Sequence, residues 1–238
     1  MYSKESHILF SPLTLLFRTD VIFTLQYGGP TAFFRDKMPQ VRDSLFVGGP
    51  HLDQIPHAPP VLHEGLDTRL HEVLVDVLHV SSVFNRHSLR RRASLIVYQE
   101  MVLSILYRLL NFQPLDGSRP GPDIEAAYRI GLTIFMTTIF LQHQHHCFID
   151  LSLTLQSLKD IVETRIKESE LAFWAMVIGG IWMWDDPGGE WLAPKLRAAS
   201  QDLGIKNWGE AHRVLKRFPW IDRIHDESGR QVWEEARE

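Results

Sequence analysis

The stretch NWGEAHRVLKRFPWID, residues 207–222, contains the signals for both ends of one helix. Asn207 is a favourable N-cap residue, and Glu210 stands three residues later, where each side chain can accept a hydrogen bond from the other residue's backbone amide. At the other end, the ring of Pro219 disfavours the helical conformation in Phe218. We therefore predict a short helix that ends before the proline and is followed by a sharp, aromatic corner.

Helix signals extend upstream through the rest of the chain. Residues 12–27 begin with Pro12, which suits the first helical position, after a capping Ser11; Gly28 suits the left-handed residue just past the end. This segment is apolar nearly all round, so we expect it to be buried. Apolar residues at three- and four-residue spacing predict further helices in residues 66–78, 88–110 and 123–143.

The last third of the chain contains all seven tryptophans. An apolar helix over residues 168–180 is predicted to stop at its Gly-Gly pair or shortly after, at DDPGG. Trp191 opens a helix that runs to about Leu203. The sequence SGRQ, residues 228–231, repeats the capping pattern and predicts the start of a final helix.

No segment shows sustained alternation of apolar and polar residues, which would indicate a strand. The predicted fold class is therefore all-α, an irregular multi-helix bundle of about 8 to 10 helices. Two loops rich in proline, residues 48–60 and 113–123, interrupt the chain, but apolar helices lie on both sides of each. We therefore predict a single helical domain over residues 1–238.

Composition limits the classes of function. A net charge of -4 argues against direct DNA binding, because nucleic-acid affinity comes mostly from clustered Lys and Arg. The single cysteine, Cys147, excludes a disulfide framework and favours a reducing compartment. The longest apolar stretch, Ile130–Leu141, is shorter than the roughly 20 residues of a membrane span, and no signal-peptide cleavage site follows residues 8–17. We expect a protein without membrane contact.

The order of the C-terminal features resembles a known family. LAFWAMVIGGIW (residues 171–182), a Trp-containing helix, LGIKNWGEAHRVLKRFPWID (residues 203–222) and HDESGRQVWEEA (residues 225–236) follow one another as in the fungal-specific transcription factor regulatory domain. That domain is the all-helical middle homology region behind the six-cysteine zinc cluster of fungal regulators. The similarity is specific over residues 168–236, although Pro219 stands where the family more often has an aliphatic residue.

The resemblance implies a structural aromatic core in the C-terminal part. Phe218 and Trp220 would anchor the corner, and the tryptophans of the set would close the same core. The predicted set is Trp174, Trp191, Trp208, Phe218, Trp220 and Trp233.

The same resemblance implies a regulatory, non-catalytic function in the nucleus without a cofactor. The chain would act through protein–protein contact, as a homo- or hetero-oligomer, and through a small-molecule inducer held among its helices. With one cysteine it cannot form the family's zinc cluster, so DNA would be contacted by another segment or by a partner. The sequence leaves open whether Met1 is the true start, which genes are controlled and which ligand binds.

Three further groups of residues offer other chemistry. His143, His146 and Cys147 have the spacing of one helix face, with Asp150 within reach, and could hold a metal, although a solvated helix end is the better interpretation. The rival function is an all-α metal-dependent enzyme of secondary metabolism, whose magnesium ligands would lie in DDPGGE. They are Asp185, Asp186 and Glu190, which an exposed turn explains more simply.

A run of arginines lies at the start of the helix predicted in residues 88–110. It could serve as a nuclear-import patch, as a phosphate contact or as part of a kinase site at Ser94. The simpler interpretation is the charged first turn of a helix. The residues concerned are Arg86, Arg90, Arg91 and Arg92.

Overall fold

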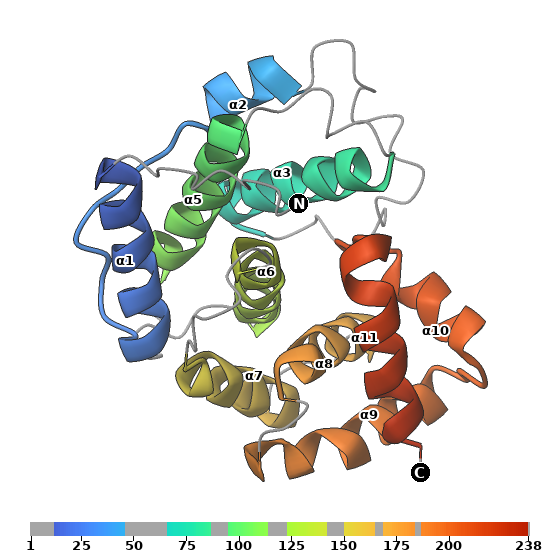
Figure 1. Ribbon diagram of the computed structural model, residues 1–238. Helices are drawn as coiled ribbons and strands as arrows, with labels where there is room; N and C mark the ends of the chain where they lie inside the picture. Colours follow the sequence, from blue (N-terminus) through green and yellow to red (C-terminus); the bar gives the residue numbers. More distant parts are fainter. Residues whose placement is uncertain are drawn as a thin grey trace, which may run out of the picture.

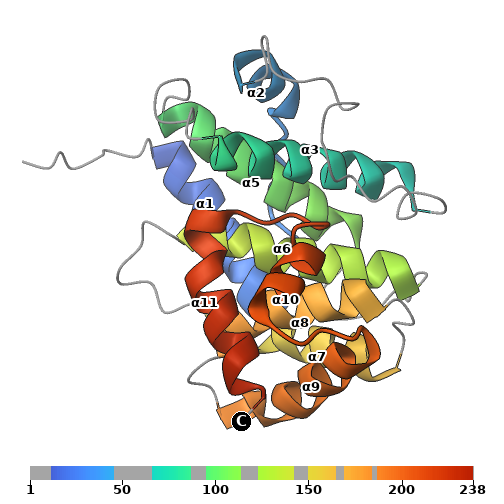
Figure 2. The same cartoon turned by 90° about the vertical axis from the view of Figure 1, so that its right-hand side faces the viewer.

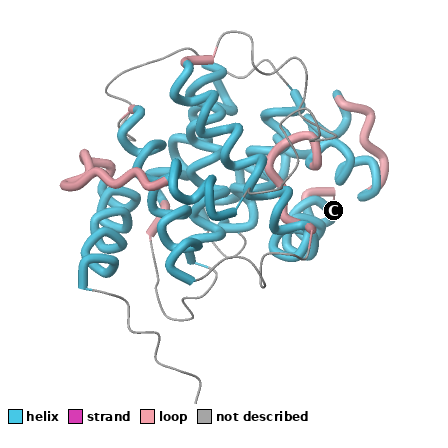
Figure 3. The backbone as a smooth tube through the Cα atoms, turned by 90° about the horizontal axis from the view of Figure 1, so that it is seen from above, coloured by secondary structure: helices cyan, strands magenta, loops and turns pink. Residues whose placement is uncertain are grey.

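The computed structural model describes residues 12–45, 66–86, 95–113, 123–141, 150–164, 169–183 and 187–237. These residues form ten α-helices and one 3-10 helix and contain no strand, which confirms the all-α prediction (Figure 3). The α-helices are α1 (Pro12–Tyr27), α2 (Met38–Leu45), α3 (Thr68–Asn85), α5 (Leu95–Phe112), α6 (Asp123–Leu141), α7 (Ser152–Thr164), α8 (Ser169–Met183), α9 (Leu192–Asp202), α10 (Trp208–Leu215) and α11 (Asp222–Glu235); the 3-10 helix is η2 (Pro187–Trp191).

Helix α6 is the centre of the fold. It contacts α3, α5, α7 and α8, and Figure 1 shows these four helices around it. Every residue from Glu125 to Phe140 is buried. Among the described helices α6 alone is long and apolar enough to cross a membrane, but 89% of that window is buried inside the protein. Its apolar surface is therefore explained by its central position.

The other helices lie in layers around α6. Figure 2 shows α2 above α3 and α5, then α6, then α8 and α7, with α9 at the bottom. Helices α10 and α11 cover one side of α8 and contact each other, while α1 packs on α5 and α7 at the other side of the molecule. The C-terminal elements are thus attached to the central layer mainly through α8.

The predicted ends of α10 are correct, with one difference in the cap. The Asn207 side chain accepts a hydrogen bond from the Glu210 amide at 3.0 Å. The Glu210 carboxylate accepts from the amide of Lys206 at 2.7 Å, one residue before the expected donor, and this hydrogen bond is the largest cause that holds the pKa of Glu210 below its usual value. The helix ends at Leu215, before Pro219.

The Gly-Gly pair of α8 does not end the helix, which continues to Met183. A Cβ atom on Gly179 would lie 2.4 Å from Leu158 Cδ2, and one on Gly180 would lie 2.5 Å from Val232 Cγ1. The two glycines therefore allow α7 and α11 to approach α8 closely. Of the two predicted ends, the stop at this pair is wrong because glycine here serves packing between helices, whereas the later end, shortly after the pair, agrees with Met183.

The prediction that SGRQ starts the last helix is also wrong. Helix α11 begins at Asp222, and residues 228–231 lie in its middle. A Cβ on Gly229 would lie 2.7 Å from Trp220 Cη2, so this glycine makes room for the indole ring. Glycine is found inside the helix because its small size is needed at this contact.

Helix α1 begins at Pro12 and is followed by Gly28 at φ 74°, as predicted, but it is not buried as expected. It turns its two charged residues, Arg18 and Asp20, inward, and each is only 9% exposed. Large apolar side chains face outward instead, among them Phe23 at 58% and Tyr27 at 67% exposed. The outward side of α1 is therefore apolar and uncharged.

Candidate functional site

The aromatic corner predicted from residues 207–222 is a packing site for three helices. The Trp174 and Phe218 rings stack at 5.4 Å with an angle of 16° between their planes. Trp174 Nε1 donates a hydrogen bond to the carbonyl oxygen of Pro219 at 3.0 Å. Because Trp174 lies on α8 and is fully buried, this contact fixes the corner to the central layer.

Trp220 anchors the second side of the corner. Its ring is 2% exposed and lies 5.2 Å from the ring of His225, and its Nε1 donates to Asp226 Oδ1 at 2.7 Å. Asn85, at the end of α3, donates to the Trp220 carbonyl and accepts from the Asp222 amide, both at 2.9 Å. Sequence patterns give no sign of Asn85, which lies more than 130 residues away along the chain.

The remaining predicted aromatics occupy the edges of this region. Trp233 is buried, and its ring lies 6.3 Å from that of Trp208, which is half-buried. Arg237 lies over the Trp233 ring at 4.6 Å. Trp191 is half-buried at the end of η2 and packs against the core. Of the six predicted aromatics, four are therefore buried, and Trp191 and Trp208 are half-buried.

His225 is a buried histidine that sequence patterns do not identify. Its ring stacks on Phe135 at 4.9 Å, and Nε2 lies 2.9 Å from Thr138 Oγ1. Nδ1 lies 3.1 Å from both the amide nitrogen and the carbonyl oxygen of Ile221. Because the Thr138 hydroxyl donates to the Phe135 carbonyl, we assign the proton of the neutral ring to Nε2, which then donates to Thr138, while Nδ1 accepts from the Ile221 amide. Burial lowers the pKa of His225 from 6.5 to about 3. The ring joins α11 to α6 in its neutral form.

This histidine predicts a dependence of stability on pH. The folded protein keeps His225 neutral down to about pH 3, whereas the unfolded chain protonates it below 6.5. The contribution to stability is complete above pH 6.5 and is lost as the pH falls from 6.5 toward 3, at up to about 1.4 kcal/mol per pH unit. Urea unfolding at a series of pH values should show that the free energy of unfolding depends less steeply on pH in His225→Gln than in the wild type. Equal slopes in the two proteins would contradict this assignment.

His212, Asp222 and Asp226 form a cluster with metal-ligand chemistry at the same corner. One ligand atom from each lies within 4.8 Å of the others, and His212 Nε2 is 3.0 Å from Asp226 Oδ1. Asp222 is paired with Lys216 at 2.5 Å, and Asp226 accepts from Trp220. Because both carboxylates have partners within the fold, the cluster is explained as a polar brace between α10 and α11.

The other sites predicted from the sequence lie mostly outside the described residues. This applies to His143, His146 and Cys147, to Arg90, Arg91 and Arg92, and to Asp185 and Asp186. Arg86 follows α3, where its amide donates to Ser82, and Glu190 is exposed in η2.

Asp150, the suggested fourth metal ligand, has a role at a helix start. Its carboxylate accepts hydrogen bonds from the hydroxyl and the amide of Ser152, the first residue of α7. The Ser152 hydroxyl is the first cause that lowers the pKa of Asp150. Asp150 therefore stabilises the start of α7 from the position before Leu151, whose carbonyl oxygen accepts the first hydrogen bond of the helix, from the amide of Leu155.

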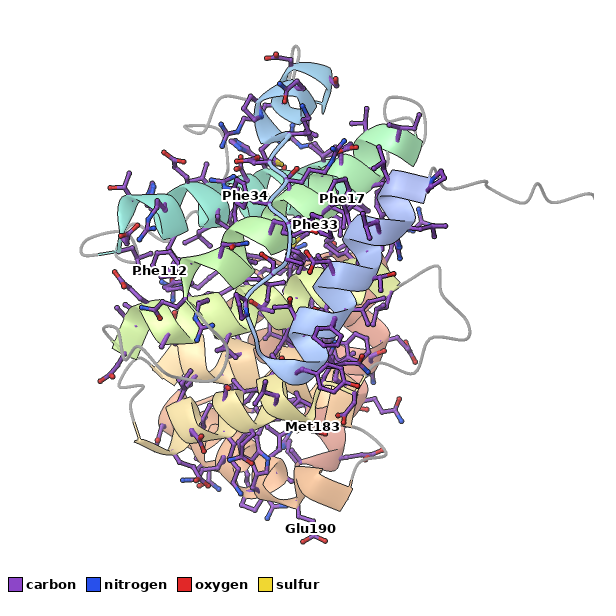
Figure 4. All side chains as sticks on the ribbon, turned by 90° about the vertical axis from the view of Figure 1, so that its left-hand side faces the viewer. Phe17, Phe33, Phe34, Phe112, Met183 and Glu190 are labelled. Atoms are coloured by element: carbon purple, nitrogen blue, oxygen red, sulfur yellow. The ribbon has the colours of Figure 1, made fainter. Side chains whose placement is uncertain are left out.

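The most prominent candidate for a functional surface is the outward side of α1, which we name the α1 face. Phe33 and Phe34 are exposed on the side of the molecule seen in Figure 4, and the Phe33 ring packs on Phe17 of α1 at 5.8 Å. Single exposed apolar residues are common on proteins, whereas several on one side of a helix are typical of an interaction site. The exposed residues of the α1 face are Pro12, Leu13, Leu15, Leu16, Thr19, Phe23 and Tyr27.

The α1 face is held in place by the inward charges of the same helix. Asp20 accepts hydrogen bonds from the amides of Ala32 and Phe33, at 2.8 and 3.0 Å, and from the Tyr107 hydroxyl at 2.9 Å. Burial and the neighbouring carboxylate raise the pKa of Tyr107, so its hydroxyl stays a donor. Arg18 lies over the Phe140 ring at 4.3 Å. Both charges therefore bind the fold and leave the outer side apolar.

A groove of about 290 Å³ is lined by Phe34 and Phe112 and by no residue of α1. Figure 4 labels both phenylalanines. Leu70 and Val73 of α3 add to its apolar lining. The polar residues at its rim are engaged within the fold, since Arg108 pairs with the buried Asp76 at 2.5 Å. The groove suits a small apolar group with few polar atoms.

Comparison with known proteins finds no counterpart. No family model, no curated protein and no solved structure matches this chain. The resemblance of residues 168–236 to the fungal regulatory domain therefore remains an expectation.

Proposed function

We propose that this chain is a regulatory module of a fungal transcription factor, or a stand-alone transcriptional modulator, that acts by protein–protein contact. The observation that carries the proposal is the α1 face: a helix that buries both of its charges and exposes its large apolar residues. Leaving such side chains in water is unfavourable by about 1.5 to 3 kcal/mol for each that a partner would fully bury. A surface of this kind favours binding of another protein.

The C-terminal features support the transcriptional part of the proposal. The residues that resemble the fungal regulatory domain lie in η2 and in α8 to α11, and two of their aromatics, Trp174 and Phe218, stack at the Phe-Pro-Trp corner. The hydrogen bonds of Asn85 tie this corner to α3. The resembling part and the part that carries the α1 face share α6, which contacts α5 on one side and α8 on the other. A partner bound on the α1 face would therefore contact the same folded unit that contains the resembling residues.

The groove provides a route for control by a small molecule. Phe34 lines the groove and is also one of the exposed aromatics beside the α1 face. The neighbouring residue, Phe33, donates its amide to Asp20 of α1. An apolar inducer in the groove would contact Phe34 and so favour one arrangement of this segment, which would change the affinity for the partner.

We propose that DNA is contacted by another segment or chain, which the net charge of -4 supports, and that the chain acts in the nucleus. The test is to join the whole chain to an unrelated DNA-binding domain and to measure expression of a reporter gene. We expect expression to differ from that given by the DNA-binding domain alone. The rival enzyme function requires Asp186 as a metal ligand, so the proposal predicts that Asp186→Asn leaves reporter expression at the level of the wild-type fusion. Equal expression with and without the chain would contradict the proposal.

A further inference from the structure

We propose that the α1 face binds the α1 face of a second copy of this chain, with the two helices antiparallel. The inference rests on the proposed function, in which the α1 face is an interaction surface, and it names the partner. Its physical basis is the spacing, the symmetry and the lack of charge of the exposed residues.

The exposed residues along the middle of the α1 face form a regular seam. Pro12, Leu16, Thr19, Phe23 and Tyr27 follow one another at intervals of four, three, four and four residues, and all five are exposed. Because an α-helix has 3.6 residues per turn, these intervals keep the five on one side of the helix. The inward side carries Val21 and Leu25, which are fully buried. The seam therefore has the spacing that packs against another helix.

The seam is symmetric about its centre in a way that suits an antiparallel pair. Its midpoint lies between residues 19 and 20, so a two-fold axis there places Leu16 opposite Phe23 of the other copy and Pro12 opposite Tyr27. Each aromatic residue then lies opposite a smaller aliphatic residue, which is the large-against-small arrangement of well-packed helices. Both pairs form twice, as a two-fold interface requires.

Thr19 lies close to the proposed axis and is prepared for an apolar contact. Its hydroxyl donates to the carbonyl oxygen of Leu15 at 3.0 Å within the same helix. This polar atom therefore needs no partner from another chain, and burial of the residue leaves no hydroxyl unsatisfied. A small side chain at the centre also lets two helices approach closely.

Charge distinguishes a second copy from the other possible occupants. The α1 face has no charged residue, because Arg18 and Asp20 are both buried. Helices that lie on membranes usually combine an apolar side with Lys and Arg on their polar side, and α1 has no such exposed cation. A partner recognised by complementary charge would find no charge here, whereas an uncharged face meets an identical face without repulsion.

The interface of one helix pair is small, so we expect a dissociation constant in the range of about 1 to 100 µM. The test is sedimentation velocity on the purified full chain across that range. The wild type should change from monomer to dimer with concentration. Phe23→Asp, which would place a carboxylate in each half of the seam, should raise the dissociation constant at least about 100-fold. The matched control is Ala198→Asp on the exposed side of α9, which should dimerise as the wild type does.

Three results would overturn the inference. One is a wild type that remains monomeric at all concentrations, and another is a Phe23→Asp protein that dimerises as well as Ala198→Asp. The third is a monomer that binds vesicles of phosphatidylcholine and phosphatidylserine through Phe23, which would make the α1 face a membrane surface. Circular dichroism confirms that each variant is folded, as expected for a side chain that is 58% exposed.

A cysteine at the proposed axis tests the arrangement of the helices. In a Cys147→Ser background, Thr19→Cys should form a disulfide between the two copies under mild oxidation, because residues near a two-fold axis face their own counterparts. Gln201→Cys, exposed on α9, is the control and should remain monomeric. Equal cross-linking at the two positions would contradict the antiparallel pair.

The dimer and the proposed function fail separately. If the chain does not dimerise but changes reporter expression through Phe23, the function stands with another partner and the inference is wrong. If the chain dimerises through the α1 face but leaves the reporter unchanged, the inference stands and the transcriptional function is wrong.

Discussion

Replacement of Trp220 by alanine is expected to lower the free energy of unfolding by about 3 to 5 kcal/mol. The indole ring is 2% exposed and fills the space that Gly229 leaves on α11. Its loss would open a cavity between α10 and α11. It would also remove the indole Nε1–H group that donates a hydrogen bond to Asp226. Urea unfolding followed by circular dichroism at neutral pH measures the change.

Trp208→Ala is the matched control for this experiment. Trp208 is half-buried at the start of α10, so the same change in side chain should cost less than half as much. If Trp220→Ala unfolds at the same urea concentration as the wild type, the corner does not hold the C-terminal helices together.

Gly131→Ala is expected to destabilise the protein by about 1 to 3 kcal/mol, as an overpacked core does. Alanine is the better helix former by about 1 kcal/mol, so the sign would be opposite at an open helix position. At Gly131 a Cβ would lie 2.4 Å from Trp174 Cζ3 and 3.0 Å from Cη2. The Trp174 ring cannot move away easily, because Phe218 stacks on it and the Pro219 carbonyl binds its Nε1.

Gly29→Ala provides the control for Gly131→Ala. No atom lies within 4 Å of a Cβ at Gly29, so this change should leave stability within about 0.5 kcal/mol of the wild type. A second variant tests the cause: Trp174→Phe should reduce the cost of Gly131→Ala, because it removes the ring atoms that the methyl group would meet. Additive effects of the two changes would show that they do not act through this contact.

Local rules predicted the corner because its signals are local. The cap at Asn207 and the restriction before Pro219 depend on a few neighbouring residues, and both ends of α10 are correct. The same rules failed at SGRQ, where an equally good local signal lies inside α11. There Gly229 makes room for the Trp220 ring. This contact joins two elements, so the pattern of a single helix cannot predict it.

The α1 face could not be predicted for a related reason. A helix that is apolar nearly all round gives no indication of which side faces the core. The side is decided by Tyr107 and by the amides of Ala32 and Phe33, all of which bind the Asp20 carboxylate. Tyr107 lies 87 residues away along the chain. The prediction that α1 is buried was wrong because two charged residues, rather than the apolar majority, determine its orientation.

The central claim is that the α1 face carries the regulatory activity, and reporter expression from two variants tests it most directly. Both are joined as whole chains to the same DNA-binding domain and produced at equal levels. We expect Ala198→Asp to change expression as the wild type does, and Phe23→Asp to give the level of the DNA-binding domain alone. The account would be contradicted if both variants, each shown to be folded, changed expression to the same extent.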